Sequence, residues 1–322
     1  SMKKGFLGID VGSVSTNLVV IGEDKQLIKK VYLRTNGQPI DAIQTGLKEI
    51  EQNLDIEIAG VGTTGSAREL AGVIVGADVV KNEITAHAVG ASNLVPGVQT
   101  ILEIGGQDSK IIILRDGVVV DFAMNTVCAA GTGSFLDQQA SRLDLAIEEF
   151  GALALKSDNP VRIAGRCSVF AESDMIHKQQ LGHSLEDIIA GLSQALVRNY
   201  LNNVGKGKEI LEPVIFQGGV AANQGIKAAF EAELETEVIV PKYYNVMGAF
   251  GSSLLAQEAV EDGTETKFNG FDVSDFEYDA SSFACQKCPN HCEIINIHQE
   301  GKLIAQWGFK CSRGKTSQLK SS

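Results

Sequence analysis

The sequence has few of the features that mark membrane, secreted or nucleic-acid-binding proteins. It contains no run of about 18 apolar residues, so we expect no membrane span. Lysine and arginine number 28 against 40 acidic residues, and the net charge of -12 argues against a nucleic-acid surface, which needs basic patches. Prolines are only 6 against 34 glycines, and the hydrophobic content is 44%. These values indicate a globular, turn-rich chain, and 322 residues are enough for two domains.

The first residues also lack a secretion signal. After Ser1 and Met2, which resemble a cloning remnant, the chain runs directly into a predicted strand, without the apolar core and cleavage site of a signal peptide. We therefore expect a cytoplasmic protein. In that compartment its 6 cysteines are expected to be metal ligands or core thiols and not disulfides.

One pattern occurs twice: a strand, a polar glycine-containing turn and a second strand. It is found in Gly5 to Ile21 and again in Thr100 to Phe122, about 95 residues further on, which indicates an internal duplication. Two such lobes facing each other would place Asp10 and Asp108 on opposite sides of a cleft. A nucleotide and Mg2+ could bind there.

The first turn has the composition of an anion-binding loop. Gly12 allows close backbone approach, Ser13, Ser15 and Thr16 offer hydroxyl and N-H groups, and Asp10 can hold a hydrated Mg2+. An ordinary hairpin with a polar turn is the alternative.

Two further patterns have both a functional and a structural interpretation. Gly218 and Gly219 lie between a predicted strand and a helix, where the backbone can pack flat against a ligand or simply turn tightly. Glu83 and His87 share a helix face at i, i+4, which suits either catalysis or an exposed helix pair.

Two cysteines lie just ahead of predicted helix starts. Cys128 belongs to Asn125 to Phe135 and Cys167 to Ala164 to Phe170. Two thiolates per chain are half of a four-thiolate site, and a two-fold homodimer would supply the other half. The alternative is a pair of buried core thiols.

With these motifs in order, the chain from Gly5 to Val260 resembles the ATP-dependent activators of 2-hydroxyacyl-CoA dehydratases, a group that includes the ATPase subunits of benzoyl-CoA reductase. Its most specific parts are the segments around Cys128 and Cys167. The resemblance implies an α/β fold of two duplicated ribonuclease-H-like lobes, as in actin-like ATPases, with a nucleotide cleft between them. A small Cys-rich C-terminal extension follows the part that the resemblance covers.

The resemblance also implies site residues and cofactors. Catalysis is assigned to Asp10, Asp108 and Gln107, with Asp10 holding Mg2+ through water. ATP or ADP is assigned to two phosphate segments and one adenosine segment. The phosphate residues are Gly12, Ser13, Ser15, Thr16, Gly105, Gly106 and Ser109, and the adenosine segment comprises Gly218, Gly219, Val220 and Asn223. One 4Fe-4S cluster per homodimer is assigned to Cys128 and Cys167 from each chain.

The implied activity is ATP-driven transfer of single low-potential electrons. The expected donor is ferredoxin or flavodoxin, and the expected acceptor is an iron-sulfur dehydratase, a benzoyl-CoA-type reductase or a double-cubane-cluster protein. A small-molecule kinase of the same superfamily is the main alternative, and a nucleotide-gated binding protein is another. Neither uses the two cysteines.

The C-terminal part departs from the short activators. We expect lobes at 1–97 and 98–244, with the helix at 245–260 packing back on the first lobe, a linker at 261–283 and a Cys-rich extension at 284–322. A hairpin turn at Glu300 and Gly301 would bring the cysteines of the extension together as a site for Zn2+ or a second iron-sulfur cluster. The alternative is a tail that binds no metal. The cysteines concerned are Cys285, Cys288, Cys292 and Cys311. The chain could also be a fragment of a longer protein.

Overall fold

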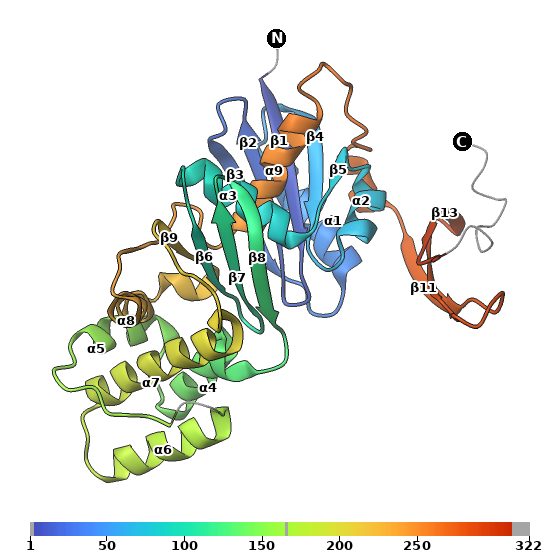
Figure 1. Ribbon diagram of the computed structural model, residues 1–322. Coiled ribbons are helices and arrows are strands. Elements are labelled where there is room, and N and C mark those ends of the chain that lie inside the picture. Colours follow the sequence, from blue (N-terminus) through green and yellow to red (C-terminus); the bar gives the residue numbers. More distant parts are fainter. Residues whose placement is uncertain (1–2, 165–166, 311–322) are drawn as a thin grey trace. The chain divides into compact units, whose positions relative to one another are not determined.

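The computed structural model describes residues 3–164 and 167–310. The chain divides into two compact units, one formed by Ser1–Glu83 with Gly248–Ser322 and the other by Ile84–Met247 (Figure 1). The change of unit after Glu83 comes earlier than the boundary expected after residue 97, because helix α3 (Glu83–Leu94) lies almost wholly in the second unit.

The first unit contains a five-stranded sheet in the order β3-β2-β1-β4-β5. Its first three strands form an antiparallel meander, and β4 and β5 add to it in parallel. The strands are β1 (Lys4–Val11), β2 (Ser15–Gly22), β3 (Leu27–Arg34), β4 (Glu57–Thr64) and β5 (Val79–Val80). Helices α1 (Pro39–Glu51) and α2 (Arg68–Val75) contribute to one apolar core with this sheet.

Helix α9 (Met247–Ala259) packs directly on the strands of the first unit. A Cβ atom added to Gly8 would lie 1.9 Å from the Ala249 carbonyl oxygen, and one added to Gly62 would lie 2.4 Å from that of Ser252. The two glycines therefore allow the helix backbone to approach the sheet.

The second unit repeats the same sheet in the order β10-β9-β6-β7-β8. Its strands are β6 (Thr100–Ile104), β7 (Ser109–Arg115), β8 (Val118–Asn125), β9 (Val214–Gln217) and β10 (Val238–Ile239). In each unit the first strand of the meander is central and pairs in parallel with the strand that follows the meander. The duplication predicted from the sequence is thus present in the fold.

Helices of the second unit bury one face of its sheet in a core that includes Phe135, Phe150 and Tyr200. They are α4 (Gly133–Arg142), α5 (Phe150–Leu155), α6 (Ser168–Gln180), α7 (Leu185–Tyr200) and α8 (Gln224–Leu234). Short 3-10 turns η1 (Ala129–Gly131), η2 (Ile147–Glu149) and η4 (Gly219–Ala222) and a π-helical turn η3 (Leu201–Gly205) connect them. Helix α7 begins where the Ser184 side chain accepts a hydrogen bond from the Asp187 N-H, a standard N-cap.

The segment expected as a linker, 261–283, has regular structure of its own. It contains the 3-10 turn η5 (Phe271–Asp275) and most of strand β11 (Tyr278–Ala284). The amide of Gln44 in α1 donates to the carbonyls of Val273 and Phe276 at 3.1 and 2.7 Å. These hydrogen bonds attach the segment to the first unit.

Strands β11, β12 (Glu293–Gln299) and β13 (Lys302–Trp307) form a third, antiparallel sheet. The turn between β12 and β13 is at Glu300 and Gly301, with positive φ angles of 49 and 75°, as in the two-residue hairpins that this sequence predicts. Among the described residues, no helix is both long and apolar enough to cross a bilayer.

Candidate functional site

The first predicted phosphate-binding turn connects β1 to β2. The Gly12 N-H donates to the Ser15 carbonyl at 2.9 Å, and this tight closure leaves Ser13 exposed. The Thr35 hydroxyl donates to the Gly12 carbonyl at 2.8 Å and lies 2.9 Å from the hydroxyl of Thr16, which is fully buried. The Thr16 side chain therefore supports the turn from behind.

Asp10 lies at the base of this turn and is approached by the segment after β4. Gly65 has φ +94°, and a Cβ there would lie 2.6 Å from Asp10 Oδ1 and 2.4 Å from the Val11 carbonyl oxygen. The Ala67 N-H donates to that same carbonyl at 3.0 Å. Sequence reasoning gave Gly65 no role, although a glycine after a strand that ends in threonines was a usable signal. A half-buried carboxylate is a suitable outer-shell partner for a hydrated Mg2+.

The second predicted turn connects β6 to β7. The Gly105 N-H donates to the Asp108 carbonyl at 2.9 Å, while Gly106 and Gln107 are exposed and Asp108 is half-buried. Ser109 is completely buried, and its hydroxyl has no hydrogen-bond partner. The turn therefore offers backbone N-H groups, Gln107 and Asp108 to a ligand, but not the Ser109 side chain.

The start of helix α4 is hydrogen-bonded to this second turn. The N-H groups of Gly133 and Ser134 donate to the carbonyls of Gly105 and Gly106 at 2.9 and 2.7 Å. A Cβ on Gly133 would lie 3.1 Å from Val220 Cγ2, so the turn η4 after β9 also packs against the start of α4. The second turn, the α4 start and the predicted adenosine segment thus converge, and sequence reasoning did not assign Gly133 or Ser134.

The adenosine segment begins with a glycine that no other residue replaces easily. Gly218 has φ 92° and ψ 172°, and a Cβ there would be 2.3 Å from the Ile104 carbonyl oxygen, whereas one on Gly219 would meet nothing within 4 Å. Asn223 caps α8 by accepting from the Ile226 N-H at 3.1 Å. Gly219 therefore leaves open space beside the turn, and the Asn223 side chain is used by the helix.

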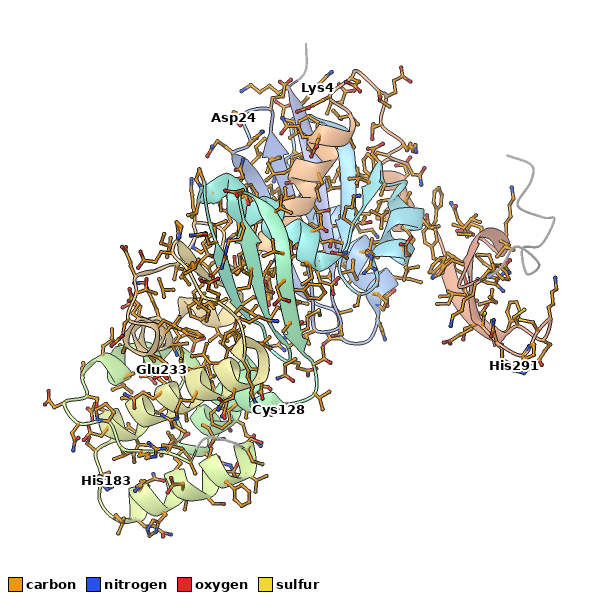
Figure 2. All side chains as sticks on the ribbon, viewed as in Figure 1. Lys4, Asp24, Cys128, His183, Glu233 and His291 are labelled. Carbon is orange, nitrogen blue, oxygen red and sulfur yellow. The ribbon has the colours of Figure 1, made fainter. Side chains whose placement is uncertain are left out.

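Cys128 lies at the end of β8, where the chain turns toward α4 (Figure 2). The Asn125 side chain accepts from the Cys128 N-H at 3.0 Å and from the Val127 N-H at 3.2 Å, and it donates to the Cys128 carbonyl at 2.8 Å. Asn125 is also the β-ladder partner of Ser109. The turn that carries Cys128 is therefore connected to the second phosphate turn by a strand pair as well as by α4.

Cys167 is the N-cap residue of α6. The Ala164 N-H donates to the Asp174 carboxylate of that helix at 2.8 Å, and Arg142 of α4 pairs with Glu172 of α6 at 2.8 Å. Both cysteines are half-buried free thiols. The position of Cys167 at the start of α6 suits an anionic sulfur ligand, whereas Cys128 precedes the short 3-10 turn η1 and not α4 itself.

Large apolar side chains next to both cysteines are exposed. Val127 is 94% exposed, and Val169 and Phe170 are 65% and 67% exposed. Clusters of this kind beside reactive side chains are typical of contact surfaces.

A buried polar cluster lies behind the second turn. Glu103 Oε2 is 3.1 Å from His87 Nε2 and accepts from Gln217 Nε2 at 2.8 Å, and Lys110 Nζ is 3.6 Å from Glu103 Oε1. Burial alone would raise the pKa of Glu103, but the charges of His87 and Lys110 and the hydrogen bond from Gln217 lower it overall. Glu103 is therefore a carboxylate at neutral pH.

The structure corrects the interpretation of Glu83 and His87 as an exposed helix pair. His87 is only 6% exposed and pairs with Glu103, while Glu83 pairs with Arg68 at 3.4 Å. Helical spacing places the two side chains on one face, but their partners come from two different elements, strand β6 for His87 and helix α2 for Glu83.

The C-terminal cysteines are only partly described. The Cys285 N-H donates to the Cys292 carbonyl at 2.8 Å, and both side chains pack with Ile294 and Phe309. Cys288 is half-buried, and Cys311 lies outside the described residues. Among the residues that are described, no three His, Cys, Asp or Glu side chains form a group that could hold a metal ion. The predicted second metal site thus has no support from this geometry.

Comparison with known proteins places residues 7–256 in a family. They match the profile of the BadF/BadG/BcrA/BcrD ATPase family. The chain is 35% identical over 257 residues to the (R)-2-hydroxyglutaryl-CoA dehydratase activating ATPase of Acidaminococcus fermentans, which covers 78% of this chain and 96% of that protein.

Solved structures agree with the sequence relatives. The activator of the 2-hydroxyisocaproyl-CoA dehydratase from Clostridium difficile, solved with bound ADPNP, is 32% identical and covers 80% of this chain and 97% of its own, with a TM-score of 0.71. Component A of the Acidaminococcus fermentans (R)-2-hydroxyglutaryl-CoA dehydratase is 33% identical, with coverages of 80% and 99% and a TM-score of 0.73. The actin-like ATPase fold expected from the sequence is thereby confirmed.

Proposed function

Because the chain belongs to the BadF/BadG/BcrA/BcrD ATPase family, whose relatives include activators of 2-hydroxyacyl-CoA dehydratases, we propose that it is an ATP-dependent reductase. In this proposal, ATP hydrolysis by the chain is coupled to the transfer of single low-potential electrons to a dehydratase-type or benzoyl-CoA-reductase-type partner. Ferredoxin or flavodoxin is the proposed donor. The kinase alternative gains nothing from these relatives, since their names describe activation of another enzyme.

The observation that carries the proposal is the direct connection between the second turn and the turn of Cys128. Gly105 and Gly106 accept hydrogen bonds from Gly133 and Ser134 at the start of α4, and Gly133 is five residues after Cys128 in the chain. A shift of the turn on nucleotide binding or hydrolysis would move the α4 start with it, since breaking a buried backbone hydrogen bond costs about 1–3 kcal/mol.

The residues that we propose for nucleotide binding are those expected from the sequence. We assign its phosphates to the turns at 12–16 and 105–109 and its adenosine to Gly218, Gly219 and Val220. Asp10 would hold Mg2+ through water. Asp108 and Gln107, which the second turn leaves accessible, would orient the attacking water, with catalysis mainly electrostatic.

The cysteines fit one 4Fe-4S cluster shared by two copies of the chain. Each chain supplies two half-buried thiols, and four thiolates are the usual ligand set. When bound, the cluster would supply a single electron at low potential. The exposed Val127, Val169 and Phe170 would be covered by the partner copy or by the electron acceptor, because apolar patches of this kind are seldom left in water.

Hydrolysis is needed for energetic reasons. Driving one electron roughly 300 mV uphill costs about 7 kcal/mol, and only differential binding of ATP to two states of the protein can supply such a difference. The hydrogen bonds between the second turn and α4 are where we expect the two states to differ.

Metal analysis of protein purified without oxygen tests the proposal. We expect about two iron atoms per chain for one cluster per dimer, a loss of that iron in Cys128→Ser and Cys167→Ser, and its retention in the control Asn159→Ala, which changes an exposed residue. Wild-type protein with ATP, but not with ADP, should re-reduce an acceptor dehydratase in the presence of reduced ferredoxin. Unchanged iron in both cysteine variants would refute the shared cluster.

The same analysis tests the C-terminal cysteines. The paired change Cys285→Ser and Cys288→Ser should lower the Zn2+ or iron content only if the extension holds a metal. Equal metal content in this variant and in wild type would remove the second site.

A further inference from the structure

Lys110 is a charged side chain buried directly behind the second turn. It follows Ser109 at the start of β7, and its side chain is 6% exposed. Its Nζ lies 2.6 Å from Asp108 Oδ2 and 3.6 Å from Glu103 Oε1. The ammonium group therefore lies between the half-exposed carboxylate of Asp108 in the turn and the buried carboxylate of Glu103.

Glu103 is itself held from the opposite side. Gln217 Nε2 lies 2.8 Å from Glu103 Oε2 and 2.9 Å from His87 Nδ1. An amide nitrogen can only donate, so His87 Nδ1 accepts, and the ring proton is on Nε2, from which it is donated to Glu103 at 3.1 Å. Lys110 therefore places a positive charge beside both Glu103 and Asp108.

The sheet fixes the positions of these groups. Glu103 on β6 is the ladder partner of Lys110 on β7 and of Gln217 on β9, so the three side chains lie in a row across adjacent strands. Helix α3 supplies His87 to the same row. Four elements of the second unit thus hold Lys110 Nζ at one place beside the turn.

We propose that Lys110 is a positioning residue for nucleotide hydrolysis, which fixes the carboxylate of Asp108 while Glu103, Gln217 and His87 fix Lys110. The inference rests on the proposed function, in which Asp108 orients the attacking water. A charge-assisted hydrogen bond at 2.6 Å restricts the side chain of a turn residue that would otherwise sample several rotamers. Misplacement of a reacting group by about 1 Å can cost 100-fold in rate.

The burial of Lys110 supports this role. Removing an ammonium from water is costly, and apolar residues of similar volume often stabilise such sites equally well. Stability alone therefore does not account for a buried lysine at this position. Lys208 forms a similar ion pair away from the predicted nucleotide turns, since its Nζ lies 2.7 Å from the carboxylate of Asp121. Asp121 is on the surface strand β8, and half of its side chain is exposed. Lys208→Met is therefore a matched control.

The experiment measures kcat and KM for MgATP hydrolysis, and the thermal unfolding midpoint, on the full chain. We expect Lys208→Met to stay within about twofold of wild type. Lys110→Met should lower kcat about tenfold or more and change KM by less than about threefold. The reason is that the carboxylate of Asp108 loses its fixed orientation, while the binding of MgATP is retained. It should also unfold at a lower temperature, since the buried carboxylate of Glu103 loses its ammonium partner.

A double variant separates positioning from a purely structural role. Lys110→Met with Glu103→Gln removes both buried charges, so the unfolding midpoint should recover while kcat stays low. Recovery of kcat together with stability, or a kcat in Lys110→Met within about twofold of wild type, would overturn the assignment. If wild-type protein does not hydrolyse ATP at all, the proposed function fails, and this assignment fails with it.

Discussion

Replacing Gly218 by alanine should destabilise the second unit strongly, while the same change at Gly219 should not. Gly218 combines φ 92° with ψ 172°, a region that costs a non-glycine residue on the order of 1–3 kcal/mol. The new Cβ would also lie 2.3 Å from the Ile104 carbonyl oxygen and 2.8 Å from its carbon. Because those atoms belong to the backbone of central strand β6, they cannot move aside, and overpacking adds about 1–3 kcal/mol.

The sum of about 2–6 kcal/mol is a large part of the 5–15 kcal/mol that usually holds a domain together. For a domain of this size, each kcal/mol of lost unfolding free energy lowers the unfolding midpoint by about 2–4 °C. We therefore expect Gly218→Ala to unfold roughly 5–20 °C below wild type.

Gly219→Ala is the control for this prediction, because its Cβ would meet nothing within 4 Å. Both variants are compared with wild type by circular dichroism during heating, without nucleotide. We expect Gly219→Ala to match wild type in this assay but to bind ATP more weakly if adenosine lies against that turn. Equal midpoints for the two variants would show that the close approach to Ile104 does not constrain the fold.

Two other predictions concern groups near the site. Tyr200 donates to the Lys110 carbonyl at 2.5 Å, and burial raises the pKa of Tyr200 well above the ordinary value. The contribution of Tyr200 to the free energy of unfolding is therefore complete below the unfolded-state pKa. It is lost as pH rises toward the folded-state pKa. Tyr200→Phe should cost about 1 kcal/mol in urea unfolding at neutral pH, and the gap to wild type should narrow above about pH 10; a gap independent of pH would contradict this. Asn125→Ala removes three hydrogen bonds around Cys128 and should release iron to a chelator roughly tenfold faster, the range seen when outer-shell partners of metal ligands are lost. The exposed Asn159→Ala is its control, and equal rates would count against cluster binding at Cys128.

The sequence by itself was sufficient for features that depend on neighbours along the chain. The repeated strand, glycine turn and strand appears as two sheets of the same order, since alternating apolar residues and turn glycines are local signals. The hairpin at Glu300 and Gly301 and the helix that begins after Cys167 were predictable for the same reason.

Only the tertiary structure decided which distant groups meet. Nothing local in the sequence indicates that Gly133 donates to Gly105 or that His87 pairs with Glu103 and not with Glu83. Strand β11 was also missed, because its polar side chains are mostly exposed and its stability comes from seven backbone pairs with β12. Periodicity reports which face of an element is apolar, but the partner across that face is set by packing between segments far apart in the chain, and here that packing brings the second turn to the start of α4.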